Sequence, residues 1–352
     1  MKNFWIISKH DLLIWALFLV SILLFDGYLI ARKEFQLPLR YYDSSFSIFL
    51  AKKLFTEKRI NLRYLGIRQK MGVPIFVYPF LIKIFSELFG DYGVYILIIL
   101  SFMVASYAFR RLLLAYGIGH NLGLCLLMVV FPLKWSLLKN TASSTCLFFG
   151  LICFCFIFYR HNKFVLLLFT LILCIFTRVE GIMLSFVFFL LYIIKFSFKR
   201  VFLIGCLISL YIFILSINDI NFEKYLILLY YPFSFKLNET FSLNPLNYYL
   251  KNAESISQLR NAHSYLQLYI PLIFSGVLLL FSELQIGIFI LTWVIFSLFI
   301  NSEYIFYFLV PSQIFAYLIG FGHIYRGRKA TIFILLFLFI YSFVYSIQEI
   351  SK

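Results

Sequence analysis

Apolar runs of close to twenty residues recur along nearly the whole chain. They occupy positions 11–30, 93–115, 118–135, 142–159, 163–178, 180–198, 201–217, 264–282, 284–300, 304–322 and 330–347. A helix needs about 20 mainly apolar residues to cross a bilayer, and it satisfies its own backbone hydrogen bonds, as lipid requires. The pattern therefore predicts an all-α, polytopic membrane protein with about 11 transmembrane helices.

Composition agrees with this interpretation. Of the 352 residues, 63% are hydrophobic and only 13% are charged, which leaves no stretch for a separate soluble domain. We therefore expect one membrane domain over residues 1–352. All six cysteines lie inside apolar runs, where packing is their expected role. The net charge of +16 is typical of contact with anionic membrane lipids, and no nucleic-acid partner is expected.

A further apolar run, 75–89, is too short to cross a bilayer unaided. If it does not cross, the basic clusters after later spans all fall on the side of the N-terminus; they are Arg110/Arg111, Arg160/Lys163, Lys195/Lys199/Arg200 and Arg326/Arg328/Lys329. The positive-inside rule favours that arrangement. We therefore predict a cytoplasmic N-terminus, an external C-terminus and a re-entrant or interfacial helix at 75–89. The protein would be multi-pass, in the cell membrane or, in a eukaryote, the endoplasmic reticulum.

This topology places two long polar segments, 32–92 and 218–263, outside the cytoplasm. The first carries ten basic residues before residue 71, and only Glu34, Asp43 and Glu57 offset them. That charge contradicts the positive-inside rule, so orientation does not explain it. A partner that carries phosphate would explain the excess of basic residues in this loop.

Asp43 is the candidate catalytic residue in the first of these loops. It precedes a run in which Phe46, Phe49 and Leu50 share one face, a pattern typical of a helix that lies along the membrane. A carboxylate at such a position is either a helix cap or a general base that takes a proton from a sugar hydroxyl. The local pattern leaves both interpretations open.

Basic residues that could bind phosphate follow Asp43. Arg63, Arg68 and Lys70 lie in the same loop, where they contact either a phosphate group or lipid headgroups. Arg178 and Glu180 interrupt two apolar runs, and charged residues at such a place face either a cavity or each other. A local ion pair is therefore the alternative to phosphate binding by Arg178.

Four short motifs, taken in order, resemble the GT-C superfamily of integral membrane glycosyltransferases, which includes protein O-mannosyltransferases and the aminoarabinose transferases that act on lipid A. YYDSSFSIFLAKKLFTEKRI looks like the acidic opening of the family's external loop, and YPFLIKIFSELFGDYGVY looks like the run that follows it. TRVEG is similar to the family's Thr-Arg-Pro-Glu-Gly bend, with Val179 in place of proline. EYIFYFLVPSQIFAYLIG is similar to a late helix, with Glu303 and Tyr304 where an arginine is common.

The resemblance implies a role for each candidate residue. Asp43 would be the general base, and the donor phosphate would be held by Arg63, Arg68, Lys70 and Arg178. The substrate pocket would be lined by Tyr42, Glu180 and Tyr304. The donor would be a polyprenyl- or dolichyl-phosphate sugar, and the acceptor a hydroxyl of a glycan, lipid or protein, with inversion at the anomeric carbon.

No cofactor follows from these motifs. The five histidines lack ligand spacing, so the sequence predicts no metal site. Many relatives carry a second acidic residue in the next external turn, which here reads FPLKWSLLKNTASS and has none. That difference leaves metal dependence open.

Two other functions remain as alternatives. A polymerase or ligase of surface-polysaccharide units would use a polyprenyl-diphosphate donor and depend on external arginines such as Arg63, Arg68 and Arg178. A transporter or flippase is the third hypothesis, although the spans show no internal repeat and little charge at mid-membrane. The lipid-phosphate-dependent glycosyltransferase is the leading hypothesis.

Overall fold

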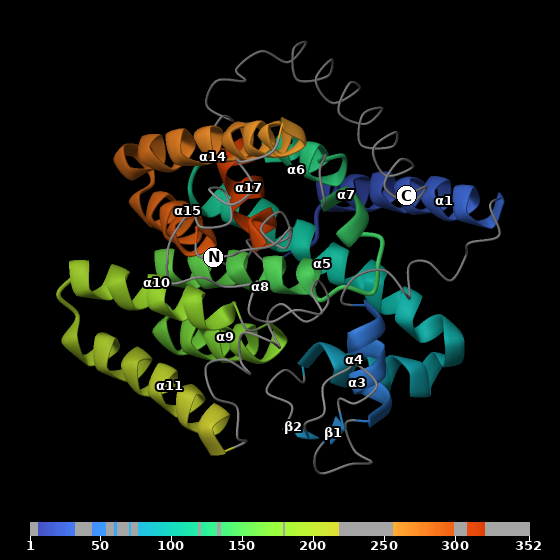
Figure 1. Ribbon diagram of the computed structural model, residues 1–352, viewed down its shortest axis with the longest axis horizontal. Helices are drawn as coiled ribbons and strands as arrows, with labels where there is room; N and C mark the ends of the chain where they lie inside the picture. The colour runs from blue at the N-terminus through green and yellow to red at the C-terminus, as the bar shows by residue number, and fades with distance from the viewer. Residues whose placement is uncertain are drawn as a thin grey trace. The chain divides into compact units, whose positions relative to one another are not determined.

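The computed structural model of the chain describes residues 6–31, 44–53, 60–61, 70–71, 77–118, 121–131, 135–178, 180–217, 256–298 and 308–320. Within these ranges the chain is overwhelmingly helical, which confirms the all-α expectation (Figure 1). The ranges also hold one short antiparallel pair, β1 (Ile60–Asn61) and β2 (Lys70–Met71), in which Ile60 lies opposite Met71.

The helices divide into two compact units, at residues 182 and 183. The first contains α1 (Lys9–Ala31), α3 (Ser44–Lys53), α4 (Val77–Phe89), η3 (Gly90–Tyr92), α5 (Gly93–Ala115), α6 (Asn121–Val129), α7 (Trp135–Leu138), α8 (Thr145–Arg160) and α9 (Phe164–Thr177). The second contains nearly all of α10 (Gly181–Ile194), then α11 (Phe198–Ile217), α14 (Ile256–Ser282), α15 (Leu284–Ser297), α17 (Val310–Ile314) and the π-helical segment η6 (Phe315–Gly320). Most predicted spans coincide with one helix to within a few residues, and the run 330–347 lies outside the described residues.

In the first unit, α1 and α5 pack side by side and run in opposite directions. Three contacts fix their register: Asp11 Oδ1 to Arg110 Nη1 at 2.9 Å, Trp15 Nε1 to Ser106 Oγ at 3.2 Å, and the rings of Phe18 and Phe102 with centroids 3.7 Å apart. The two helices are therefore antiparallel, and higher residue numbers in α1 pair with lower residue numbers in α5.

This register determines where the intervening segment begins and ends. Each helix has 23 residues and is about 35 Å long, so the end of α1 and the start of α5 lie at the same end of the pair. The segment between them, which includes α4, therefore begins and ends at the same end of the α1–α5 pair. That run 75–89, here α4, does not cross the membrane stays a prediction.

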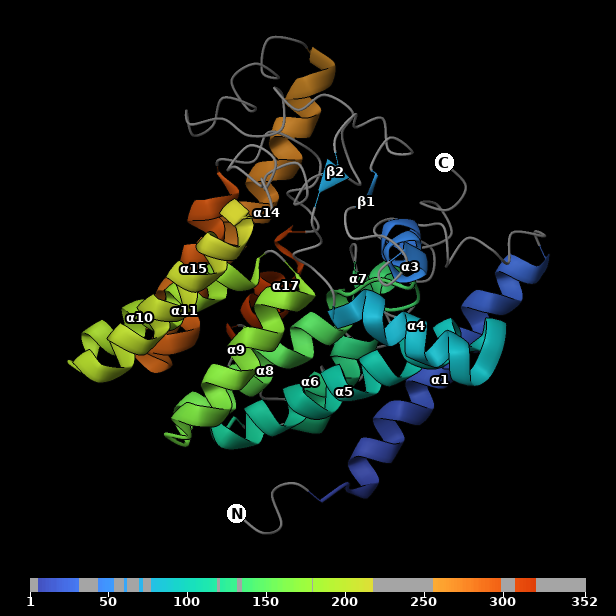
Figure 2. The ribbon, with the colours of Figure 1, turned by 90° about the horizontal axis from the view of Figure 1, so that it is seen from below.

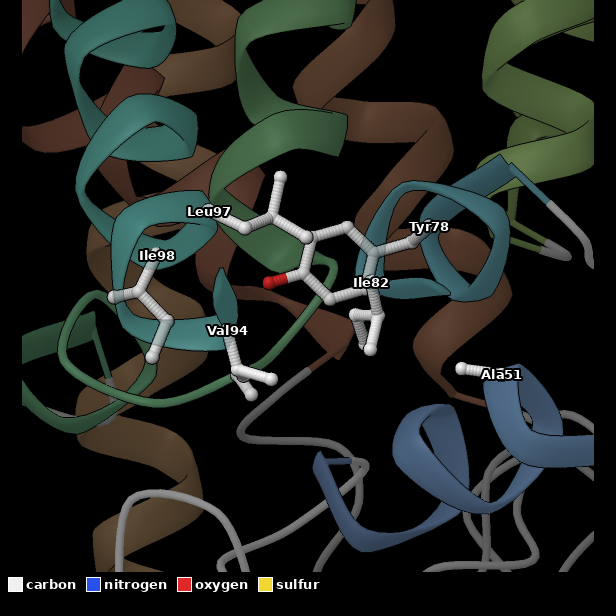
Figure 3. Packing of buried hydrophobic residues seen from close by; sticks show 7 residues of the cluster. Ala51, Tyr78, Ile82, Val94, Leu97 and Ile98 are labelled. Atoms are coloured by element: carbon white, nitrogen blue, oxygen red, sulfur yellow. The ribbon is translucent and has the colours of Figure 1, made fainter. Parts of the chain in front are cut away.

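The corner between α4 and α5 depends on two glycines. Gly90 has a φ of +61°, in the left-handed region that glycine tolerates. A Cβ on Gly93 would collide with the carbonyl of Phe85, so α5 begins in direct contact with α4. Beyond the corner the two helices share a small apolar core (Figure 3), formed by Ala51, Tyr78, Ile82, Val94, Leu97, Ile98 and Ala142. α4 is thereby held against α5.

α8 packs beside α5 and runs in the same direction (Figure 2). The rings of Phe109 and Phe149 have centroids 5.8 Å apart, and the Arg160 guanidinium lies 5.1 Å from the centre of the Tyr116 ring. α9 then returns beside α8, with the sulfur atoms of Cys155 and Cys174 4.0 Å apart. The start of α8 and the end of α9 therefore lie at the same end of this layer.

The span predicted at 118–135 is not one helix, so that prediction was wrong. α6 ends at Val129, and the single turn of α7 occupies Trp135–Leu138. Pro132 stands between them in the sequence, and proline lacks the N–H that a continuous helix needs. Trp135 is buried and donates from Nε1 to the Met128 carbonyl at 2.9 Å, which ties α7 to α6.

The second unit consists of helical hairpins. α10 and α11 contact each other through Arg200, whose guanidinium lies 5.3 Å from the centre of the Tyr192 ring. α14 and α15 lie side by side (Figure 1). α14 begins at Ile256, whereas the sequence predicted an external segment as far as 263 and a span from 264. The helix thus extends beyond the predicted span, because residues 256–263 are helix-compatible but polar and hydropathy detects only the apolar part of a helix.

Among the helices that the structure describes, α5 has both the length and the apolar composition to cross a bilayer. Shorter apolar helices accompany it, at Thr145–Arg160, Phe164–Thr177, Gly181–Ile194, Tyr269–Ser282, Leu284–Ser297 and Val310–Gly320. The structure thus establishes an all-α fold whose described part holds one helix both long and apolar enough to cross a bilayer.

Candidate functional site

The sequence predicted eight site residues, and five of them lie outside the described residues: Tyr42, Asp43, Arg63, Arg68 and Tyr304. Lys70 is described through its backbone, which lies opposite Asn61 in the β1–β2 pair. Arg178 and Glu180 lie in the described part, so the site is built from them outward.

Arg178 and Glu180 form a forked ion pair directly after α9. Arg178 donates from Nε to Glu180 Oε2 at 3.1 Å and from Nη2 to Glu180 Oε1 at 2.6 Å. Glu180 is only 3% exposed, and this guanidinium supplies an opposite charge to its carboxylate. The local ion pair considered from the sequence is therefore present, and phosphate binding by Arg178 stays a prediction.

A hydrogen-bond chain leads from Arg178 to the start of α8. Arg178 Nη1 donates to Thr145 Oγ1 at 2.7 Å, and a guanidinium can only donate, so the Thr145 hydroxyl accepts this bond. Ser143 Oγ lies 2.8 Å from Thr145 Oγ1, and either hydroxyl can donate the proton of this bond. Ser143 Oγ also accepts the Thr145 backbone N–H at 3.2 Å. Since one proton joins the two hydroxyls, the other hydroxyl proton of the Ser143–Thr145 pair has no acceptor among the described residues.

Lys139 is a buried cation four positions before Ser143. Its ammonium donates to Ser21 Oγ at 2.7 Å and lies 5.5 Å from the centre of the Phe18 ring. The side chain is 4% exposed, and no carboxylate within the described ranges lies at ion-pair distance from it. Lys139 lies in the turn after α7, outside the apolar helices, and burial lowers its pKa to about 7.

Lys139 and Ser143 belong to one buried segment, residues 139–145, called the polar turn below. All seven side chains are buried, and six of them are polar: Lys139, Asn140, Thr141, Ser143, Ser144 and Thr145. From sequence this stretch was notable only for the acidic residue that it lacks, and its hydrogen-bond donors were missed. The signal was present in KNTASST, a polar run between two apolar ones.

A second buried ionic cluster lies at the other end of the α1–α5 pair. Asp11 accepts from Arg110 at 2.9 Å, from Arg111 at 3.3 Å and from the Ser8 backbone N–H at 2.8 Å. Arg111 also donates to the Ile6 carbonyl. The cluster joins the N-terminal residues to the last turns of α5.

Within the described ranges, no group of three or more His, Cys, Asp or Glu side chains is arranged to hold a metal ion.

Neither a protein-family model, nor a curated protein, nor a solved structure matches the chain. The GT-C similarity therefore remains a resemblance of four short motifs. The functional proposal depends on the chain's own residues.

Proposed function

We propose that this protein is a polytopic membrane glycosyltransferase that moves a sugar from a polyprenyl-phosphate donor to a hydroxyl acceptor on the non-cytoplasmic face. Membrane lipids would surround its apolar helices. Exposed large apolar side chains on α1 and α11 fit that environment, and they include Leu23, Phe198 and Phe202.

The distribution of positive charge along α1 and α5 supports an outward-facing loop. Arg110 and Arg111 on α5, and Arg160 on the neighbouring α8, lie at the end of these helices that holds the N-terminal residues. Segment 32–92 leaves from the opposite end. When the arginine end faces the cytoplasm, as the positive-inside rule favours, the ten basic residues of the loop face outward. A substrate with a phosphate group accounts for that charge.

The observation that carries the proposal is the polar turn. Its Ala142 packs in the same apolar core as Tyr78 and Val94, near the corner where α4 meets α5. The turn is thus a polar, positively charged segment enclosed by apolar helices on the loop's side of the unit. Polar and ionisable groups so placed in a membrane domain usually mark the path of a substrate.

In the proposed reaction, Asp43 takes the proton of the acceptor hydroxyl while the oxygen attacks the anomeric carbon of the donor. The bond from that carbon to the phosphate oxygen breaks, and polyprenyl phosphate leaves with the electron pair. Arg63, Arg68 and Lys70 would stabilise the charge that develops on the leaving phosphate. Tyr42, Glu180 and Tyr304 would line the pocket.

The test is transfer of a radiolabelled sugar by membranes that contain Asp43→Asn, with Glu57→Gln as the matched control in the same loop. Loss of a general base is expected to lower the rate by about 100-fold or more, while the control keeps its rate. Normal transfer by folded Asp43→Asn would exclude Asp43 as the base. Parallel assays with monophosphate and diphosphate donors separate this activity from a repeat-unit polymerase.

A further inference from the structure

Lys139 differs from the other buried cations of the first unit. Arg110 and Arg111 share the carboxylate of Asp11, and Arg178 has Glu180. Lys139 has the Ser21 hydroxyl and the Phe18 ring, both uncharged. A buried cation without an opposite charge is unfavourable, and among the described residues nothing supplies that charge. An anionic ligand beside Lys139 would supply the missing negative charge.

Ser143 gives a second, independent reason to expect an oxygen ligand. It shares one hydroxyl–hydroxyl bond with Thr145, so one proton of this pair lacks a described acceptor, although the side chains are only 1% and 2% exposed. A buried donor without an acceptor costs about 1–3 kcal/mol. An oxygen acceptor beside Ser143 would remove that cost.

The start of α8 favours negative charge at the same place. The helix has 16 residues and begins at Thr145, and its first turn contains no acidic side chain. Unpaired backbone N–H groups and the helix dipole attract anions to such a terminus. The same seven-residue segment thus holds a cation without an opposite charge, a hydroxyl donor without an acceptor and the positive end of a helix.

We propose that the polar turn is an anion subsite, in which the Lys139 ammonium and the Ser143 hydroxyl bind oxygens of a phosphate group. The inference rests on the proposed function, in which this phosphate is that of the lipid-linked sugar donor. A phosphate presents several acceptor oxygens around one centre and carries the required charge, so it suits both donors together. On binding, the flexible side chain of Lys139 exchanges the Ser21 hydroxyl for a phosphate oxygen.

The experiment measures polyprenyl-phosphate binding to the full chain in phosphatidylcholine nanodiscs, by the shift of the unfolding temperature with lipid concentration. Lys139→Met is expected to weaken binding about 10-fold or more, as loss of a charge-assisted hydrogen bond would. Ser143→Ala is expected to weaken it about 3- to 10-fold. Lys83→Met is the matched control, because Lys83 is a partly exposed cation on α4 paired with Glu87, and it should bind like the wild type.

Unchanged binding by Lys139→Met would overturn the subsite. Inorganic phosphate and phosphatidylglycerol are tested beside the polyprenyl lipid. Stabilisation that depends on Lys139 with inorganic phosphate alone would overturn the lipid source. If Lys139→Met does not fold, Lys139→Gln replaces it in the binding measurement, because glutamine keeps a hydrogen-bond donor for Ser21. Asp43→Asn should still bind polyprenyl phosphate, so failure of the proposed base and failure of the subsite give different results.

Discussion

Arg178 donates from Nη1 to the hydroxyl of Thr145 across 2.7 Å, and so joins the bend after α9 to the first residue of α8. The two residues are 33 positions apart in sequence. One edge of the guanidinium holds Glu180, and the remaining terminal nitrogen orients Thr145 and, through it, Ser143. The TRVEG bend therefore positions the polar turn in addition to any contact with substrate.

The ion pair predicts a cooperative effect on stability. Arg178→Met removes the guanidinium that pairs with the buried Glu180 carboxylate and should cost about 3–5 kcal/mol of unfolding free energy. The double variant Arg178→Met/Glu180→Met should recover most of this loss, because neither charge remains. Thermal unfolding in detergent measures both. A double variant as unstable as Arg178→Met would show that the pair is not the source of the loss.

Lys139 predicts a rise of stability with pH. Its folded pKa is about 7, below the ordinary value of 10.5. Between these two values the unfolded chain binds a proton that the folded chain lacks, so the unfolding free energy increases with pH, by at most about 1.4 kcal/mol per pH unit. Below pH 7 both states bind the proton, and the full cost of burying the cation is present. Burial is the main cause, and the nearby titratable group in the described part is the Cys146 thiol.

The variant Lys139→Met separates the contribution of Lys139 to the pH dependence of stability from that of other groups that titrate in the same range. The variant should be more stable than the wild type at pH 7, by a few °C in unfolding temperature, and the difference should shrink toward pH 10. If the difference in unfolding temperature between the wild type and Lys139→Met does not change with pH, the lowered pKa of Lys139 is refuted.

Asp11 predicts a structural effect at the other end of α1. Asp11→Asn removes the carboxylate that Arg110 and Arg111 share, and leaves two buried guanidinium groups without it. The expected loss is about 3–5 kcal/mol of unfolding free energy. Lys9→Gln, a change to an exposed neighbour on the same helix, should be within about 0.5 kcal/mol of the wild type.

The absence of a side chain at Gly150 allows α5 and α8 to pack closely. A Cβ at Gly150 would lie 3.1 Å from the Ala105 Cα, which is backbone and cannot move aside easily. Gly150→Ala should therefore destabilise by about 1–3 kcal/mol. At Gly205 on α11 a Cβ would meet the Phe189 ring at an ordinary 3.6 Å. Gly205→Ala should be neutral or stabilising by up to about 1 kcal/mol, since alanine is the better helix former.

The proposed topology predicts which residues face which side of the membrane. Tyr92, which is 76% exposed, lies at the loop end of α5, and Asn162 lies in the turn after α8 near Arg160. In a chain with the exposed Cys206 changed to serine, an impermeant maleimide on intact cells should label Tyr92→Cys but not Asn162→Cys. Asn162→Cys should react only after permeabilisation. Labelling of both from outside would contradict the orientation.

The sequence by itself determined the helices. Apolar runs located α1, α5 and α8–α11 because the preference of a side chain for an apolar environment is a local property that adds along the chain. The prediction that run 75–89 does not cross the membrane also came from sequence, from the charge at the helix ends, and it stays a prediction. The Arg178–Glu180 contact could be considered from sequence because the two residues are only two positions apart.

Only the tertiary structure decided what the polar turn contains. Lys139 contacts Ser21 across 118 positions of sequence, and Asp11 contacts Arg110 across 99. No local pattern distinguishes a lysine that is exposed on a loop from one that is buried without a carboxylate, because the difference depends on which other helices pack around it. The break between α6 and α7 precedes residues 139–145, and the packing of α1, α5 and α8 around this segment made a short polar run into a buried site.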